Sequence, residues 1–262
     1  MALDIDRYHA VVSLVNQWDP RIKIAALGVL IFAIALVKTL PVAVVAFALA
    51  VFLIWLTALP FHFVSHGLSF VLIFLVPFFI IMPLSYPGES AFTILGVGFA
   101  WEGFRLAALI FLKAISIVMV TYSIFGSSRF DVSMFALQKL KCPKVVVQML
   151  LFTYRYTFVF LDEMKRMHTS MSARGFVPRT NMRTMNVFGH FVGTLLIRSF
   201  ERTDRVYKAM LSKGYQGDLH VLVTFESRPS DFIKAGIAIL IAVTLVAIDL
   251  SGNFNQAVIG WY

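Results

Sequence analysis

Residues 39–59 contain no charged side chain and are almost entirely apolar. A helix needs roughly 17 to 25 such residues to cross the hydrocarbon core of a bilayer, which is about 30 Å thick. The whole chain agrees with a membrane setting, because 59% of its residues are hydrophobic and only 14% are charged. This stretch therefore predicts a transmembrane helix, and the bilayer becomes the solvent in which the chain must fold.

Four further stretches have the length and apolarity of membrane spans: residues 22–37, 68–84, 106–125 and 232–250. The first is short, and we expect the long side chains of Lys23 and Lys38 at its ends to reach the interface, so that their ammonium groups stay in water. No stretch alternates in the way typical of β-strands. We therefore predict an all-α, polytopic membrane protein with about five transmembrane helices.

The positive charge is concentrated in residues 129–228. This window holds 16 of the 23 Lys and Arg residues but only 7 of the 14 Asp and Glu residues, so it carries the whole net charge of +9. Basic segments of membrane proteins stay in the cytoplasm, where they meet anionic membrane lipid. This explanation leaves no need for a nucleic-acid partner, and we expect none.

The charge pattern also predicts the topology in a plasma (inner) membrane. Residues 1–128 would hold four spans, residues 129–228 a basic cytoplasmic helical region, and residues 229–262 the last span and an external tail. Because four crossings separate the two ends of the first region, the N-terminus would be cytoplasmic and the C-terminus external.

Two apolar stretches in the basic window are each interrupted by arginine. They are residues 145–161, with Arg155, and residues 187–200, with Arg198. An arginine at the centre of a span costs at least about 2.5 to 3.5 kcal/mol. We therefore favour amphipathic helices lying on protein or on the membrane surface over two further spans, which remain the alternative.

A short motif occurs twice in the basic window, each time as a small residue, a cation, a glycine and an aromatic residue. The copies are Met171-Ser172-Ala173-Arg174-Gly175-Phe176 and, 39 residues later, Met210-Leu211-Ser212-Lys213-Gly214-Tyr215. At the same offset Asp162 corresponds to Glu201 and Arg166 to Arg205. We therefore expect one structural unit to be used twice in the chain.

Each copy has the pattern of a helix C-terminus. Glycine adopts the left-handed conformation just beyond the last helical residue, and the residue that follows folds back onto the last turn. Phe176 would then approach Met171, and Tyr215 would approach Met210. Arg174 and Lys213 would cap the two helices, where a cation complements the negative end of the helix dipole. Two ordinary capped helices remain the plain alternative, but the repetition favours a pair of similar partners.

At this point the chain resembles the transmembrane coupling component, or T component, of energy-coupling factor transporters, in the cobalt or nickel branch. The resemblance covers nearly the whole chain. It rests on residues 19–23 (Asp-Pro-Arg-Ile-Lys), on Arg155-Tyr156 with Asp162-Glu163, and on residues 199–206 and 207–217, the last with Ala-Met and Gly-Tyr-x-Gly elements.

The resemblance implies a function and partners. A T component holds a substrate-binding membrane subunit against two cytoplasmic ABC-type ATPases, and its two coupling helices dock into ATPase grooves through Ala-Arg-Gly signatures. The contacts would fall on Ala173, Arg174 and Gly175, and, in the second copy, on Ser212, Lys213 and Gly214. The second copy departs from the signature, because lysine offers a point charge in place of the planar fork of arginine. The carried substrate would be cobalt or nickel, with a vitamin as the alternative.

Other readings lack the residues that they need. The sequence has no G-x-x-x-x-G-K-[ST] loop to hold ATP phosphates and no protease motif, so we expect a non-catalytic subunit. His62 and His66, at helical spacing, are too few for a metal site, and we expect no resident metal or cofactor. Lys113 is the one charge well inside a span, and we expect it to reach the interface or to pair with Glu102 or Asp249.

Two non-coupling functions remain as alternatives. A channel or secondary carrier ordinarily has broken helices in both halves, yet Pro77 and Pro83 have no counterpart in residues 232–250. A scaffold whose basic region binds anionic lipid would show steep salt dependence and would not depend on Gly175 or Gly214.

Overall fold

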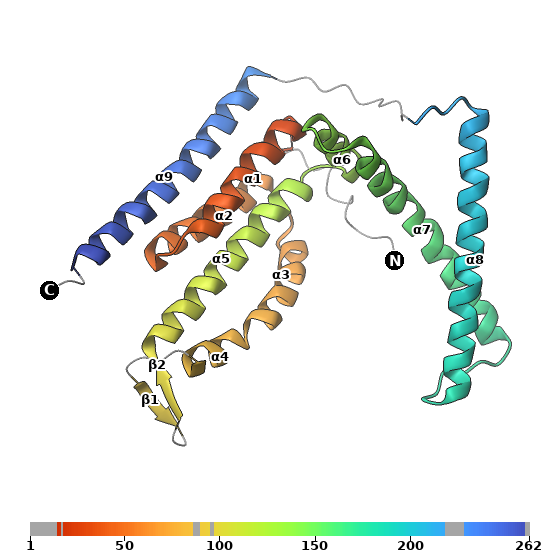
Figure 1. Ribbon diagram of the computed structural model, residues 1–262, viewed down its shortest axis with the longest axis horizontal. Helices are drawn as coiled ribbons and strands as arrows, with labels where there is room; N and C mark the ends of the chain where they lie inside the picture. Colours follow the sequence, from red (N-terminus) through yellow and green to blue (C-terminus); the bar gives the residue numbers. More distant parts are fainter. Residues whose placement is uncertain (1–14, 17, 86–89, 95–96, 218–227, 260–262) are drawn as a thin grey trace. The chain divides into compact units, whose positions relative to one another are not determined.

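The computed structural model describes residues 15–16, 18–85, 90–94, 97–217 and 228–259 (Figure 1). The chain divides into two compact units. Of the described residues, the larger unit holds those from 15 to 140 and from 228 to 259, and the smaller holds those from 141 to 217.

The larger unit is a helical bundle. Its helices are α1 (Pro20–Leu36), α2 (Leu40–Thr57), α3 (Phe61–Leu75), α4 (Phe78–Ser85), α5 (Trp101–Phe125), α6 (Phe130–Lys139) and α9 (Pro229–Ile259). A short antiparallel hairpin of β1 (Ser90–Ile94) and β2 (Val97–Ala100) precedes α5. The helix α6, which the sequence division at residue 128 placed in the basic region, packs against α1 in this unit.

The predicted fold class is confirmed. Within the described residues, five helical segments are long and apolar enough to cross a membrane: Leu40–Thr57, Val64–Leu84, Trp101–Phe125, Lys144–Ala173 and Pro229–Ser251. Four of them coincide with predicted spans. The helix α1, with 17 residues, is shorter than these, and its crossing stays a prediction. The remaining segment, Lys144–Ala173, includes residues 145–161. Length and composition permit a span there, so the surface location that we expected also stays a prediction.

The core of the bundle is apolar and tightly packed around α1, which lies against both α9 and α5. Leu27 and Ile34 of α1 are almost completely buried. The buried face of α2, which packs on α5, includes the small residues Ala43, Ala46 and Ala50. Small residues let two helix backbones approach closely, which is how helices associate in lipid.

The outer surface of the bundle is hydrophobic. Phe32 of α1, Phe70 of α3 and Trp55 of α2 are 74%, 70% and 68% exposed. A surface of this kind is unfavourable in water and suits contact with acyl chains. The bundle therefore has the surface of a multi-pass membrane protein.

Two features of the bundle differ from the predictions. The third predicted span, residues 68–84, is divided into α3 and α4 at Pro77, whose ring lacks the backbone N–H that would continue the helix. The hairpin corrects the expectation of a chain without strands; its strands have only 5 and 4 residues, too short for an alternating pattern to stand out. The predicted turn at residues 86–89 lies outside the described residues.

Lys23 corrects another prediction, because it does not reach water. Its side chain is completely buried, and Nζ donates hydrogen bonds to the hydroxyl oxygens of Ser127, at 2.9 Å, and of Ser128. These serines follow α5, so the lysine ties the start of α1 to the α5–α6 connection. A buried ammonium needs such acceptors to offset its lost hydration. Lys38, in contrast, is exposed as expected.

A second polar cluster joins the end of α1 to the middle of α5 and to the second half of α9. Lys113 donates from Nζ to the carbonyl oxygens of Ala35 (2.6 Å) and Val37 (2.7 Å) at the end of α1. Asp249 accepts from the backbone N–H groups of Lys38 and Thr39 at the start of α2. The expected pairing of Lys113 with Asp249 therefore takes an indirect form, in which both side chains hold the α1–α2 turn from two helices.

The smaller unit consists of two long helices, α7 (Lys144–Ala173) and α8 (Met182–Ser212). The helix α8 begins where the side chain of Asn181 accepts a hydrogen bond from the Thr184 N–H at 2.9 Å, as a helix N-cap does. The two helices run in opposite directions and cross (Figure 1). Both are largely exposed, and Val147 is the one buried side chain that the structure gives for the described α7 and α8.

Candidate functional site

The first copy of the repeated motif forms the C-terminus of α7. Arg174 caps the helix, and Gly175 has a φ of +80°. The Gly175 N–H donates to the Ser172 carbonyl at 3.0 Å, and the Phe176 N–H donates to the Met171 carbonyl at 3.1 Å. This pair of hydrogen bonds is the Schellman motif, which satisfies the last carbonyl groups of a helix.

The second copy forms the C-terminus of α8 with the same geometry. Lys213 caps the helix, and Gly214 has a φ of +82°. The Gly214 N–H donates to Leu211 at 2.9 Å, and the Tyr215 N–H donates to Met210 at 3.0 Å. The helix ends predicted from the sequence repeat are thus confirmed, down to the left-handed glycine in each copy.

Both capping cations point their charge outward. Arg174 and Lys213 are exposed, as are the small residues before them, Ala173 and Ser212. Among the described residues, neither cation forms a salt bridge. Two exposed cations on helix ends of equal shape can each bind a carboxylate or backbone carbonyl group of a partner.

The two ends are far apart along the helix pair. The Phe176 ring packs edge to face on Phe188 of α8, with ring centroids 6.1 Å apart. From Phe188 to Lys213 the helix α8 rises about 37 Å, at 1.5 Å per residue. One small ligand cannot reach both cations, so the pair of helices presents two separate sites.

Each helix end is anchored to the other helix, but by different contacts. The end of α7 uses the contact between Phe176 and Phe188. At the end of α8, the Tyr215 hydroxyl donates to Gln148 Oε1 of α7 at 3.0 Å, and Gln148 Nε2 donates to the Gly217 carbonyl at 2.9 Å. The sequence reasoning missed Gln148; the tyrosine in place of phenylalanine was the signal, because a partly buried hydroxyl needs a partner.

An ion pair joins the helices where they cross. Arg198 of α8 pairs with Glu163 of α7. Arg198 had been interpreted only as an interruption of an apolar stretch, and the structure gives it an interhelical partner. This contact explains how a long apolar segment tolerates the arginine.

The other residues of the repeat have unequal surroundings. Glu201 and Arg205 line a polar groove of about 270 Å³ at the crossing, together with Phe160, Glu163, Leu195, Arg198 and Arg202. Their counterparts Asp162 and Arg166 are exposed on α7. The structure thus brings only the second pair to the crossing, and the equivalence of the two copies is limited to the helix ends.

In the described part of the chain, no three His, Cys, Asp or Glu side chains form a cluster that could hold a metal ion. The side chain of His62 lies outside the described set.

Comparison with known proteins identifies the family. Residues 12–224 match the CbiQ family, which is described as a cobalt transport protein. An energy-coupling factor transporter transmembrane protein, EcfT, of Heliobacterium modesticaldum is 25% identical over 82% of this chain and 85% of its own length. An uncharacterised protein of Methanocaldococcus jannaschii is 24% identical over 93% of this chain and 86% of its own. A cobalt transport protein, CbiQ, of Rhodobacter capsulatus is 23% identical over 55% and 61%.

These matches confirm the resemblance to T components that was drawn from the residues. The family match contains both copies of the repeated motif and most of the helical bundle. The chain belongs to the CbiQ family of cobalt transport proteins.

Proposed function

We propose that this chain is the transmembrane coupling component of an ATP-driven importer, and that it transmits the motion of two cytoplasmic ATPase subunits to a substrate-binding membrane subunit. Family membership supports a membrane component of a cobalt-type transporter. The name of the Heliobacterium relative supports the energy-coupling role.

The observation that carries the proposal is the pair of matched helix ends. Arg174 and Lys213 have the same backbone geometry and are both exposed. They lie near opposite ends of the stretch of α8 from Phe188 to Lys213, which is about 37 Å long. A pair of similar partners, each with one acidic or carbonyl-lined groove, fits this arrangement better than one asymmetric ligand does. Two ABC-type ATPases are such a pair, and the chain itself has no phosphate-binding loop.

The substrate-binding membrane subunit would contact the apolar groove between α7 and α8. Near the end of α8 this groove has a volume of about 340 Å³ and is lined mainly by aromatic and aliphatic side chains, among them Phe152, Tyr156, Val206, Tyr207 and Met210. Exposed apolar surface of this kind marks an interaction site. A membrane partner seated there would touch both helices and would sense a change in their crossing angle.

The mechanism that we propose is mechanical. When ATP binding closes the two ATPases, the docked ends of α7 and α8 move with them. The helices pivot at their crossing, where Glu163 and Arg198 pair, and the groove on the membrane partner's side changes shape. A rigid-body motion of packed helices is a common way to carry such a change. In this mechanism the ATP hydrolysis and the substrate site belong to the partners.

The cargo would be a cobalt ion, as the family description indicates. Nickel is the near alternative and a vitamin the more distant one, because substrate choice would lie in the membrane partner. We also propose that the N-terminus is cytoplasmic and the C-terminus external, as the charge distribution predicts.

Charge reversal at the helix ends tests the proposal. The chain would be co-expressed with the ATPase subunits of its own source, and their affinity for it in detergent would be measured. We expect Arg174→Glu to weaken ATPase binding strongly and Lys213→Glu to weaken it to a smaller degree. Lys165→Glu is the matched control, since Lys165 is exposed on the same helix, about 13 Å before Arg174, and undergoes the same charge change. Unchanged binding by Arg174→Glu, or an equal loss with Lys165→Glu, would contradict the docking assignment.

A further inference from the structure

Two grooves adjoin on the pair of helices α7 and α8. The polar groove at the crossing and the apolar groove near the end of α8 have volumes of about 270 and 340 Å³, and they share two lining residues, Phe160 and Arg202. Glu163 lines the polar groove, and Tyr156 and Val206 line the apolar one. Arg202 therefore lies at the border between a charged surface and an apolar surface.

Arg202 is also a cation without a counter-charge. Residues 198–208 of α8 contain four cations, and three of them have an acidic neighbour. These three pairs are Arg198 with Glu163 of α7, Arg205 with Glu201 four residues before it, and Lys208 with Asp204 at 2.7 Å. The side chain of Arg202, in contrast, forms no hydrogen bond or ion pair within the described part of the chain, although the residue is half-buried.

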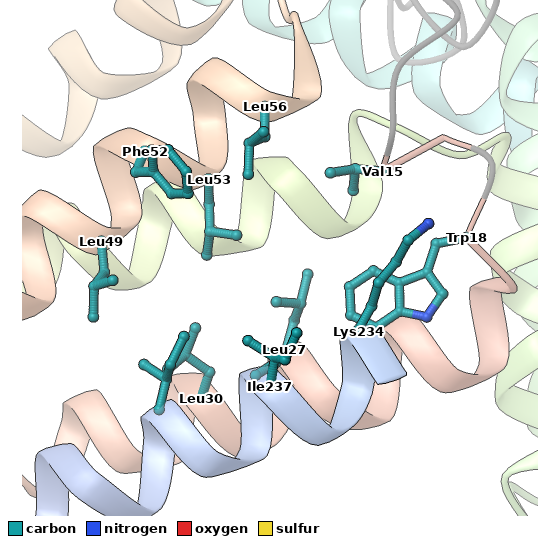
Figure 2. Close-up of a pocket in the computed structure, with 12 residues that line it drawn as sticks. Val15, Trp18, Leu27, Leu30, Leu49, Phe52, Leu53, Leu56, Lys234 and Ile237 are labelled. Atoms are coloured by element: carbon teal, nitrogen blue, oxygen red, sulfur yellow. The ribbon is translucent and has the colours of Figure 1, made fainter. Parts of the chain in front are cut away.

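The groove between α2 and α9 on the helical bundle differs in this respect (Figure 2). It has a volume of about 280 Å³, and of the described residues that line it only Lys234 is charged. The Lys234 ammonium lies 3.9 Å from the carboxylate of Asp231, which is buried. The charge in that groove is thus offset within the chain, whereas the charge of Arg202 is not.

A protein that covers the two adjoining grooves would remove the remaining water from Arg202. A buried charge is costly unless it meets an opposite charge and hydrogen-bond acceptors. A carboxylate supplies both, and its two oxygens match the fork of a guanidinium group. A backbone carbonyl would supply an acceptor but no charge. Recognition of a lipid phosphate ordinarily uses a cluster of several free cations, and here one is left over.

We propose that the substrate-binding membrane subunit places one Asp or Glu side chain against Arg202 and packs neighbouring apolar side chains into the groove lined by Tyr156 and Val206. This inference rests on the proposed function, and it identifies the chemistry by which that partner binds. Arg198 and Arg205 lie one helical turn on either side of Arg202 and add positive potential that attracts the acidic group. The ATPases, in contrast, would bind at the helix ends, so the two kinds of partner use different surfaces.

Charge reversal at Arg202 tests the inference in the complex purified from membranes of its own source. We expect Arg202→Glu to weaken binding of the membrane subunit by about 30-fold or more while both ATPases are retained, which also shows that the variant is folded. A factor of 30 is about 2 kcal/mol, the lower end of the cost of losing a desolvated charge pair. Lys165→Glu is the control, since Lys165 is exposed on α7 and lines neither groove.

A cross-link identifies the group that faces Arg202. In Arg202→Lys, a zero-length carbodiimide reagent joins the new amine to any carboxylate in contact with it, and mass spectrometry locates the bond. We expect the bond to connect position 202 to an Asp or Glu of the membrane subunit.

The possible failures are distinguishable. Native binding of the membrane subunit by Arg202→Glu, or an equal loss of the ATPases, would overturn the inference and leave the coupling role standing. So would a cross-link from position 202 to an ATPase, to a second copy of this chain or to a phospholipid. Purification of the native chain without any of the partners would instead contradict the coupling role itself, and the inference with it.

Discussion

The left-handed glycine at the end of α7 offers a test in which backbone geometry alone is changed. Gly175 has a φ of +80°, and a Cβ added there would meet no atom within 4 Å. The substitution Gly175→Ala therefore introduces no steric clash. It adds only the backbone cost of a left-handed L-residue, which is about 1–2 kcal/mol.

Gly189 is the matched control. It lies inside α8, its φ is not positive, and an added Cβ there would also meet nothing within 4 Å. Replacement of glycine by alanine inside a helix stabilises it by about 0.5–1 kcal/mol. The same chemical change should therefore have opposite signs at Gly175 and Gly189.

Hydrogen exchange measured by mass spectrometry in detergent would show the effect. In Gly175→Ala we expect the Phe176 amide, which makes one of the Schellman hydrogen bonds, to exchange about 5- to 30-fold faster than in the native chain, as a loss of about 1–2 kcal/mol implies. Gly214→Ala should give the same acceleration at the end of α8, where φ is +82°. Exchange in Gly175→Ala at the native rate, or a loss of protection in Gly189→Ala of equal size, would refute the reasoning.

Three further substitutions test other contacts by thermal or chemical unfolding in detergent. Asp249→Leu should lower the free energy of unfolding by about 2–4 kcal/mol, because it leaves the backbone N–H groups of Lys38 and Thr39 without an acceptor. Asp249→Asn should lower it less. A leucine variant as stable as the native chain would contradict this account. A double-mutant cycle with Arg198→Met and Glu163→Gln should give a coupling energy of about 0.2–1 kcal/mol between the two side chains, since the ion pair is partly exposed. A coupling energy of zero would show that the pair does not hold the two helices together. Tyr215→Phe should lower the free energy of unfolding by about 1 kcal/mol, because it deletes the hydrogen bond to Gln148. In a chain that already carries Gln148→Leu, the same substitution should have a smaller effect. An equal effect in both backgrounds would show that the loss does not come from this hydrogen bond.

Elements fixed by local chemistry could be predicted from the sequence. The spans follow from apolar length, and the two helix ends follow from glycine, whose left-handed conformation needs no tertiary contact. The same holds for the exposed positions of Arg174 and Lys213. These features depend on residues a few positions apart, so one chain contains all the information that they need.

Features that depend on distant residues could not be predicted. Lys23 lies 104 residues from Ser127, and nothing near it in the sequence distinguishes a buried lysine from one at the interface. The contacts of Gln148 with Tyr215 and of Arg198 with Glu163 likewise arise only when α7 and α8 cross. The hairpin before α5 was missed because its strands are too short to show a period.

The coupling role is tested most directly by purifying the chain from membranes of its own source in mild detergent and identifying what co-purifies by mass spectrometry. We predict two ATPase copies, or two similar ATPases, and one small membrane protein per chain, with the ATPases lost in Arg174→Glu and retained in Lys165→Glu. Recovery of the native chain alone, stable and without an ATPase, would contradict the account and favour a channel or a lipid-binding scaffold.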